Sequence, residues 1–256
     1  MIRLMLRKKP ASAGFLFLGF LFSIAISALA QDYEREKRLN EQTLESLIEG
    51  DAQWLVQKNG HRFLALLIEV EKPKGAVILA HGRGWSPDVS LYGPLRRRLA
   101  EKGYTTLALQ MPVLDAQAKM IDYIEVYPDA DDRFRAAEAF LKAKKYKNIA
   151  IVSHSVGASM ANHYLITADR HDVKAWVFIG IVNGLEQMFR IKIPVLDVYG
   201  EADWQVTRWG ADERLKQIKR VRGSEQKVVP NAGHFFEGQE QALTDVIASF
   251  LSRNLR

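Results

Sequence analysis

Residues 149–160 read IAIVSHSVGASM, an apolar β-branched stretch that runs through Ser-His-Ser into glycine and small residues. The pattern predicts a buried β-strand that turns abruptly into a helix. Such a turn forces its central residue into a strained backbone conformation and lifts that side chain above the sheet. The residues two positions before and after the centre must then be small, because strand and helix nearly touch there.

Ser155 fits the centre of this turn better than Ser153. The neighbours of Ser155 at two positions' distance are Ser153 and Gly157, both small, whereas Ser153 would have the bulky Ile151 in that place. Ser155 is therefore the candidate nucleophile and Ser153 a packing residue. The stretch departs from the usual G-x-S-x-G pattern, since Ser153 adds a hydroxyl and a Cβ where the turn is tightest.

Strands and helices alternate on both sides of this stretch. Apolar strands are predicted at residues 76–81, 104–112, 148–153, 173–182, 193–200 and 226–230, and helices at 91–103, 132–144, 156–168 and 241–255. Nearly continuous apolar strands that alternate with helices predict an α/β fold, a mostly parallel sheet covered by helices on both faces. A hairpin at residues 54–70, around the Asn59-Gly60 turn, is expected to add antiparallel edge strands.

The first thirty residues are expected to lie outside this domain. They combine a basic start, an apolar run and an Ala-Leu-Ala ending, which is typical of a signal peptide at residues 1–30. We therefore expect a periplasmic or secreted protein whose mature chain starts at Gln31; the alternative is an uncleaved membrane anchor. A loose amphipathic helix is predicted at residues 31–50, with Leu39, Leu44 and Leu47 as its apolar stripe, followed by one α/β domain at residues 51–256.

Charge gives little indication of partners. Loss of the four basic residues of the signal lowers the formal net charge from +6 to +2. The two basic runs, Arg96–Arg98 and Lys142–Lys147, lack the aromatic interleaving of nucleic-acid binders, so we expect solvated helix faces and no nucleic-acid partner. Membrane contact is expected only through an uncleaved signal, and the oligomeric state stays open. The chain has no cysteine, which excludes a lipoprotein anchor and thiolate chemistry.

A serine nucleophile needs a base and an orienting carboxylate, which in this architecture follow it in the order acid, then histidine. Asp203 and Glu201 come just after the strand at 193–200, and His234 follows the next strand. We predict Asp203 as the acid because it lies where a short carboxylate can turn toward the histidine, with Glu201 as the alternative. Asp197 lies inside its strand and is expected to be structural.

An oxyanion needs two backbone N–H donors. Val156, directly after the nucleophile and at a helix start, is predicted to supply one. The loop after the strand at 76–81 reads His81-Gly82-Arg83-Gly84, and we predict the Arg83 N–H as the second donor because the flanking glycines let the backbone approach closely. His81 and His154 are expected to orient backbone.

The ordered segments ILAHGRG, SHSVG, VYGEAD and NAGHFF resemble the α/β-hydrolase superfamily over residues 54 to 254. By position, the resemblance places the superfamily's catalytic triad on Ser155, Asp203 and His234. The segment LYGPLRRRLAEKGYTTLALQMP, with Tyr-Pro-Asp-Ala at 127–130, resembles an uncharacterised family of bacterial exported hydrolase-like proteins. That resemblance implies the α/β-hydrolase fold and gives no substrate.

Aromatic and methionine residues flank the catalytic loops. We predict that Trp85, Tyr127, Met188 and Trp204 bind substrate, with Met111 and Phe235 as equal candidates for pocket or core, and that residues 113–132 cover the site. No metal-ligand spacing and no phosphate-binding glycine loop is present, so neither metal nor cofactor is expected.

Two functions follow from these patterns. The first is a serine hydrolase that acts on an ester of modest size, in a small molecule or an acylated envelope component, with an amide or an acyl group on an envelope glycan as alternatives. The second is a non-catalytic binding or envelope-assembly protein that kept the hydrolase fold.

Overall fold

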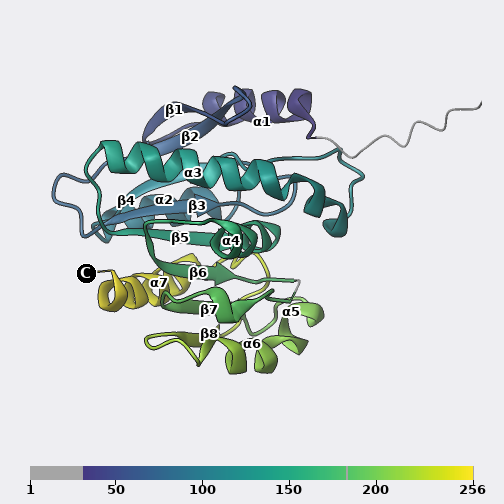
Figure 1. Ribbon diagram of the computed structural model, residues 1–256, viewed down its shortest axis with the longest axis vertical. Coiled ribbons are helices and arrows are strands. Elements are labelled where there is room, and N and C mark those ends of the chain that lie inside the picture. Colours follow the sequence, from purple (N-terminus) through teal and green to yellow (C-terminus); the bar gives the residue numbers. More distant parts are fainter. Residues whose placement is uncertain (1–30, 183, 256) are drawn as a thin grey trace, which may run out of the picture.

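The computed structural model describes residues 31–182 and 184–255, and within them one eight-stranded sheet runs through the molecule (Figure 1). The strands are β1 (Asp51–Val56), β2 (Arg62–Ile68), β3 (Ala76–Ala80), β4 (Thr105–Leu109), β5 (Ile149–His154), β6 (Val173–Ile179), β7 (Val195–Gly200) and β8 (Glu225–Val229), in the spatial order β1-β2-β4-β3-β5-β6-β7-β8. Strand β2 pairs antiparallel with both β1 and β4, and all later pairs are parallel.

Helices cover both faces of the sheet (Figure 1). They are α1 (Tyr33–Glu45), α2 (Tyr92–Glu101), α3 (Tyr127–Ala143), α4 (Val156–Thr167), α5 (Gln205–Trp209), α6 (Ala211–Ile218) and α7 (Glu240–Asn254), with 3₁₀ helices η1 (Met120–Val126) and η2 (Met188–Arg190). One apolar core joins the sheet to α3 and α4, and a second joins its other face to α2 and α7. The predicted mostly parallel sheet with an antiparallel N-terminal hairpin is confirmed.

The prediction at residues 31–50 differs from the structure in how the helix packs. Helix α1 is not loose, but its buried side chains are the polar Glu36, Asn40 and Thr43 rather than the leucines. Leu44, from the expected apolar stripe, is exposed. The prediction of a helix is therefore correct. The prediction that its leucines form the side that packs against the protein is wrong.

A buried ion pair explains this polar contact. Glu36 accepts a hydrogen bond from the Arg133 guanidinium of α3 at 2.8 Å, and both side chains are almost fully buried. Arg133 also donates to the Gln110 carbonyl at 2.6 Å and to Gln57 Oε1 at 3.1 Å, so it joins α1, α3 and the ends of β1 and β4.

The expectation of a solvated face at Arg96–Arg98 is wrong for Arg96. Its side chain is buried and donates to Asp88 Oδ1 at 2.5 Å and to the Glu49 carbonyl at 2.6 Å. The reason is that α2 turns this side chain toward the segments before β1 and α2, which offer a carboxylate and a carbonyl.

The predicted signal peptide lies outside the described residues. Within residues 31–182 and 184–255, no helix combines the length and apolar character needed to cross a membrane.

We predict that Arg133→Met lowers the free energy of unfolding by about 3–5 kcal/mol, because it leaves the Glu36 carboxylate buried without its guanidinium. Adding Glu36→Gln should recover part of that loss. Urea unfolding followed by circular dichroism measures both. As a control, Lys216→Met breaks an exposed pair with Glu213 and should cost no more than about 1 kcal/mol. Equal losses in the two single variants would contradict the role given to the buried pair.

Candidate functional site

Ser155 stands at the abrupt turn between β5 and α4. Its backbone has φ 54° and ψ −122°, a conformation that side-chain-bearing residues rarely adopt. Its N–H donates to the Ile179 carbonyl at 2.9 Å, which holds the turn against β6. A Cβ on Gly157 would lie 2.3 Å from the His81 carbonyl oxygen, so this position needs glycine. The turn therefore has the strained geometry that the sequence predicts.

Ser153 has a packing role that explains why serine replaces the usual glycine. The side chain is buried, and its hydroxyl accepts from Trp176 Nε1 at 2.9 Å and donates to the Val177 carbonyl at 3.2 Å. Both partners lie on β6, away from α4. The extra atoms of Ser153 thus fill a place in the core instead of crowding the turn.

His234 and Asp203 form a buried pair. His234 Nδ1 lies 2.7 Å from Asp203 Oδ1, and the exposed Trp204 ring stacks on the imidazole at 3.7 Å between centroids. Gly180 leaves room for the pair, because a Cβ there would lie 3.1 Å from His234 Nδ1. Burial raises the pKa of Asp203, but hydrogen bonds and charge from His234, with the N–H groups of Trp204 and Gly200, outweigh it and hold that pKa below its usual value.

This pairing sets the direction in which His234 can act. An ionised carboxylate only accepts hydrogen bonds, so Nδ1 carries the proton and Nε2 of the neutral ring is an acceptor. His234 Nε2 has no hydrogen-bond partner among the described residues, and His234 lines the same cavity as Ser155. The ring therefore presents an unpaired nitrogen, and the residue lines the cavity that Ser155 also lines.

The other two carboxylates are engaged elsewhere. Glu201 accepts from the Asn231 N–H at 3.0 Å in an exposed turn. Asp197 is buried and bonded to Arg214 Nε at 2.8 Å. Of the three carboxylates around β7, the structure brings only Asp203 to His234.

The two predicted oxyanion donors are Val156, the first residue of α4, and Arg83, in the loop after β3. Among the described residues, neither the Arg83 N–H nor the Val156 N–H has a backbone hydrogen-bond partner. The Gly82 N–H, in contrast, donates to the Tyr92 hydroxyl at 2.7 Å. Arg83 lines the cavity, and its N–H, unlike that of Gly82, has no partner of this kind among the described residues, so it stays the predicted donor.

Tyr92 and His154 connect the two loops, and sequence reasoning missed Tyr92. The Tyr92 hydroxyl lies 2.7 Å from His154 Nδ1, and His154 Nε2 lies 3.0 Å from the His234 carbonyl oxygen. Because Nε2–H must donate to that carbonyl, Nδ1 accepts from the tyrosine. The chain Gly82–Tyr92–His154–His234 therefore holds the oxyanion loop and the histidine loop at a set spacing. Nothing in the sequence around Tyr92 signals this contact.

His81 orients backbone in a similar way. Its Nε2 accepts from the Met111 N–H at 2.8 Å, while Nδ1 donates to the Gly82 carbonyl at 2.8 Å. Burial lowers the pKa of His81 to about 3, and burial with the nearby His234 lowers the pKa of His154 to about 3. Both rings are therefore neutral scaffold groups at physiological pH.

A cavity of about 530 Å³ opens above Ser155. Its walls are Trp85, Tyr92, Trp204 and Phe235, with Arg83, Lys119 and Met120 at one side. Of the predicted substrate-binding residues, Trp85 and Trp204 line this cavity and Tyr127 lines a neighbouring one.

Met188 lines neither of these cavities. The 3₁₀ turn η2 directs its side chain into the hydrophobic core, where it is buried. Met111 is likewise a core residue, whereas Phe235 belongs to the cavity.

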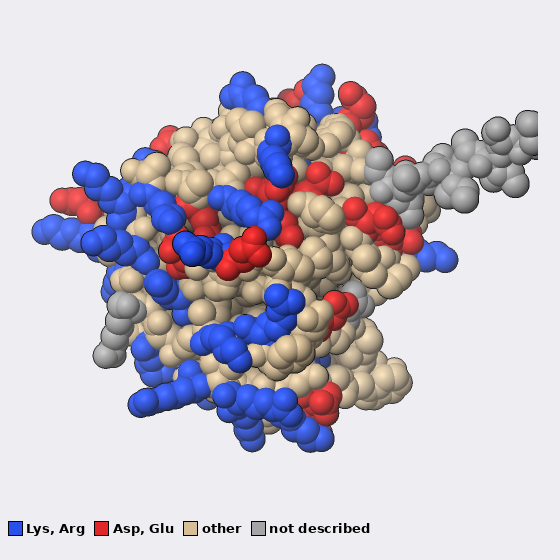
Figure 2. Space-filling model, viewed as in Figure 1, with Lys and Arg blue, Asp and Glu red and all other residues tan. Residues whose placement is uncertain are grey.

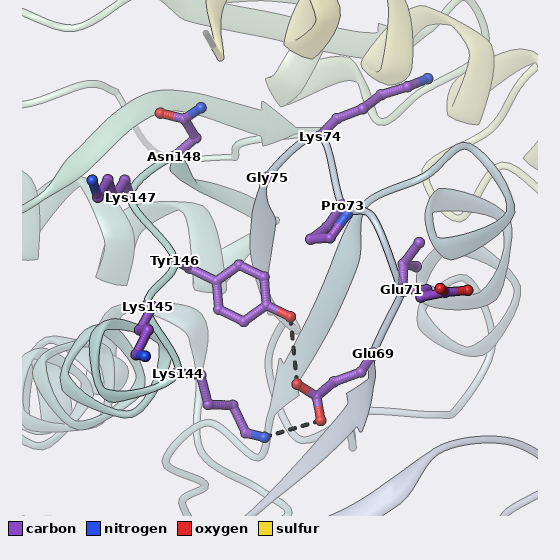
Figure 3. Close-up of a pocket in the computed structure, with 11 residues that line it drawn as sticks. Glu69, Glu71, Pro73, Lys74, Gly75, Lys144, Lys145, Tyr146, Lys147 and Asn148 are labelled. Atoms are coloured by element: carbon purple, nitrogen blue, oxygen red, sulfur yellow. Dashed lines mark hydrogen bonds and ion pairs between the residues drawn. The ribbon is translucent and has the colours of Figure 1, made fainter.

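A larger cavity, of about 730 Å³, lies at the opposite end of the sheet (Figure 3). Lys and Arg side chains gather at this end of the molecule, where α3 ends (Figure 2). Lys144 donates to Glu69 at 2.9 Å, and Figure 3 shows Lys74 and Lys147 pointing away from the Tyr146 ring. The lining of this cavity includes no serine, threonine, cysteine or histidine, so it offers no serine–histidine pair and is not the candidate reaction site.

Metal-ligating side chains do not gather in the part of the chain that the structure describes: no group of three or more His, Cys, Asp or Glu residues there is arranged to hold an ion.

Comparisons with known proteins concern the sequence family and the fold. A family of proteins of unknown function, DUF3530, matches residues 25–123, and no curated protein sequence matches the chain. An esterase of Pyrococcus furiosus, Pf2001, has a TM-score of 0.68 at 18% identity, over 84% of this chain and 94% of that one. Dienelactone hydrolase from Anabaena variabilis has a TM-score of 0.63 at 19% identity, over 81% and 99%.

A third similar structure is XC6422 from Xanthomonas campestris, described as an α/β serine hydrolase without a lid. Its TM-score is 0.63 at 18% identity, over 80% of this chain and 94% of that one. At these identities the likeness concerns the fold. The chain has the α/β-hydrolase fold.

We predict that the His81 and His154 imidazoles stay neutral in NMR titrations above about pH 4, since both pKa values lie near 3. The unfolded chain takes up these protons below its pKa of about 6.5, so the free energy of unfolding should fall as pH decreases from 6.5 toward 3. Each ring contributes at most about 1.4 kcal/mol per pH unit. His154→Gln should make this decrease shallower, and protonation of either ring in the folded protein near pH 6 would contradict the assignment.

Proposed function

We propose that this protein is a serine hydrolase that cleaves ester bonds with Ser155, His234 and Asp203. One observation carries the proposal: a strained serine and an unpaired imidazole nitrogen, the latter oriented by a buried carboxylate, line the same cavity. Each residue alone has an ordinary structural explanation. The three residues come together from the ends of β5, β7 and β8. A serine nucleophile requires such a group, in which a histidine takes the serine proton and a carboxylate orients the histidine.

In the proposed reaction the Ser155 hydroxyl attacks the ester carbonyl and passes its proton to His234 Nε2. The carbonyl oxygen becomes an oxyanion, which the N–H groups of Arg83 and Val156 stabilise. The C–O bond then breaks, and the alcohol leaves with the proton from His234. Water activated by the same nitrogen hydrolyses the acyl-serine and releases the acid.

Asp203 stabilises the imidazolium that forms in both steps. The buried Asp203 carboxylate oxygen Oδ1 lies 2.7 Å from His234 Nδ1 and accepts its hydrogen bond. Because the proton stays on Nδ1, Nε2 is free to accept the serine proton. The aromatic walls of Trp85 and Phe235, whose rings lie 5.1 Å apart, favour an acyl group of modest size.

We also propose that the reaction takes place in the periplasm or outside the cell. The signal-like sequence of residues 1–30 supports this location. Intact-mass measurement of the exported protein tests it: the expected mass begins at Gln31, and a retained leader contradicts the cleavage site.

Ser155→Ala should abolish ester hydrolysis, by on the order of 10⁶-fold in kcat, without changing the melting temperature. Ser153→Ala should keep activity within about tenfold, since its hydroxyl binds β6 and not the substrate. The change removes two neutral hydrogen bonds within the core, from Trp176 Nε1 and to the Val177 carbonyl. The measurements are kcat on a short-chain aryl ester and labelling by a fluorophosphonate probe. An unmodified protein that neither reacts with the probe nor hydrolyses any ester would instead be a non-catalytic binding protein.

Asp203→Asn should lower kcat by roughly 10⁴-fold, because the amide no longer fixes the tautomer of His234. Glu201→Gln is the matched control and should cost less than about tenfold, since Glu201 only accepts from Asn231. Side-by-side kcat values decide between them, and a larger loss in Glu201→Gln would reassign the acid.

A further inference from the structure

A second cavity lies beside the proposed reaction site, with the 3₁₀ helix η1 between the two. Met120 of η1 lines the reaction cavity, whereas Ile121 and Ile124 line the second one, which measures about 270 Å³. Both isoleucines are exposed to solvent. The mechanism proposed above makes no use of this second cavity.

One face of α4 forms the floor of the second cavity. Ser159, Asn162 and His163 follow the i, i+3, i+4 spacing that places side chains together on a helix. The Asn162 side chain holds the opposite loop by two bonds, donating to the Glu186 carbonyl at 3.2 Å and accepting from its N–H at 2.7 Å. The cavity is thus formed without a ligand.

Ser159 lines this cavity, and its buried hydroxyl is unpaired among the described residues. The residue is only 7% exposed, and its Oγ has no hydrogen-bond partner among residues 31–182 and 184–255. A buried hydroxyl without a partner costs free energy, which a ligand hydroxyl at this place would recover.

Two further lining residues, His163 and Glu186, offer acceptors. Asp131 Oδ1 lies 3.1 Å from His163 Nδ1, which must donate to it, so the neutral His163 ring presents Nε2 as an acceptor. Glu186 adds an exposed carboxylate. The lining includes no lysine or arginine, so the cavity does not favour an anion.

Aromatic and aliphatic groups complete the walls. Tyr127 packs on His163 with ring centroids 5.3 Å apart, and Leu185 lies in the lining with the two isoleucines. A ligand that suits this cavity has several hydroxyl donors and an apolar C–H face. A neutral pyranose ring has both.

We propose that this cavity binds a neutral sugar unit, and that the ester cleaved at Ser155 is one on an acylated glycan. The second part rests on the proposed function. Ser155 and Ser159 are one helical turn apart, about 6 Å along α4, so a sugar held at Ser159 lies within reach of an ester carbonyl at Ser155. The substrate class is thus an acylated glycan with the sugar beside η1 and the acyl group among the tryptophans.

Binding is tested without any turnover, on the unmodified mature chain. Saturation-transfer difference NMR is recorded with the methyl glycosides of glucose, galactose, mannose and N-acetylglucosamine. At least one should receive saturation, and Ser159→Ala should weaken its binding by roughly fivefold, the size of one neutral hydrogen bond. Ile124→Trp, which fills the cavity from its exposed rim, should remove binding.

Ser249→Ala is the matched control, an exposed serine in α7 far from the cavity, and should leave binding unchanged. The sugar assignment is overturned if none of the four glycosides receives saturation, or if Ser159→Ala and Ile124→Trp leave the signal unchanged. Stronger binding of tetramethylammonium than of every glycoside overturns it in favour of a cationic ligand.

Kinetics separate this inference from the proposed function. Ser159→Ala should lower kcat/KM for methyl 6-O-acetylglucoside by roughly fivefold and leave that for p-nitrophenyl acetate unchanged. Glycoside binding without hydrolysis of either ester would overturn the proposed function and keep the sugar site. Hydrolysis of both esters without glycoside binding would keep the function and overturn the sugar site.

Discussion

Helix α4 approaches the end of β3 so closely that no side chain fits at Gly157. A Cβ at Gly157 would lie 2.3 Å from the His81 carbonyl oxygen and 2.8 Å from that of Ala80. This contact fixes where α4 begins, and therefore where the Val156 N–H and the Ser155 side chain stand relative to the loop after β3. The strained φ of Ser155 is the local cost of that contact.

The loops around the serine are held by buried hydrogen bonds rather than by apolar packing. Tyr92 and His154 join the loop after β3 to the loop after β8, and His81 joins it to the end of β4. Every bond in this set has a defined donor only if both imidazoles are neutral. Burial keeps them so, which separates these two scaffold histidines from His234, whose Nε2 has no partner among the described residues.

The sheet could be predicted because its strands are β-branched apolar runs. The order Ser155, Asp203, His234 could be predicted because each of these polar residues follows such a run closely in the sequence. The polar side of α1 that packs against the protein could not be predicted. Glu36 is buried there because it pairs with Arg133, which lies 97 positions along the chain. Tyr92 and Arg96 are similar cases. Their partners, His154 and the Asp88 and Glu49 segments, come together only in the folded chain, and short-range periodicity carries no information on such pairs.

Trp204 stacks on the His234 imidazole at 3.7 Å while its own side chain remains exposed to solvent. Indole emission is sensitive to the charge and mobility of a ring in contact with it. The protein therefore carries an intrinsic optical probe on its proposed general base. Difference spectra against Trp204→Phe would follow that base directly, through acyl transfer and water attack, with no label added to the chain.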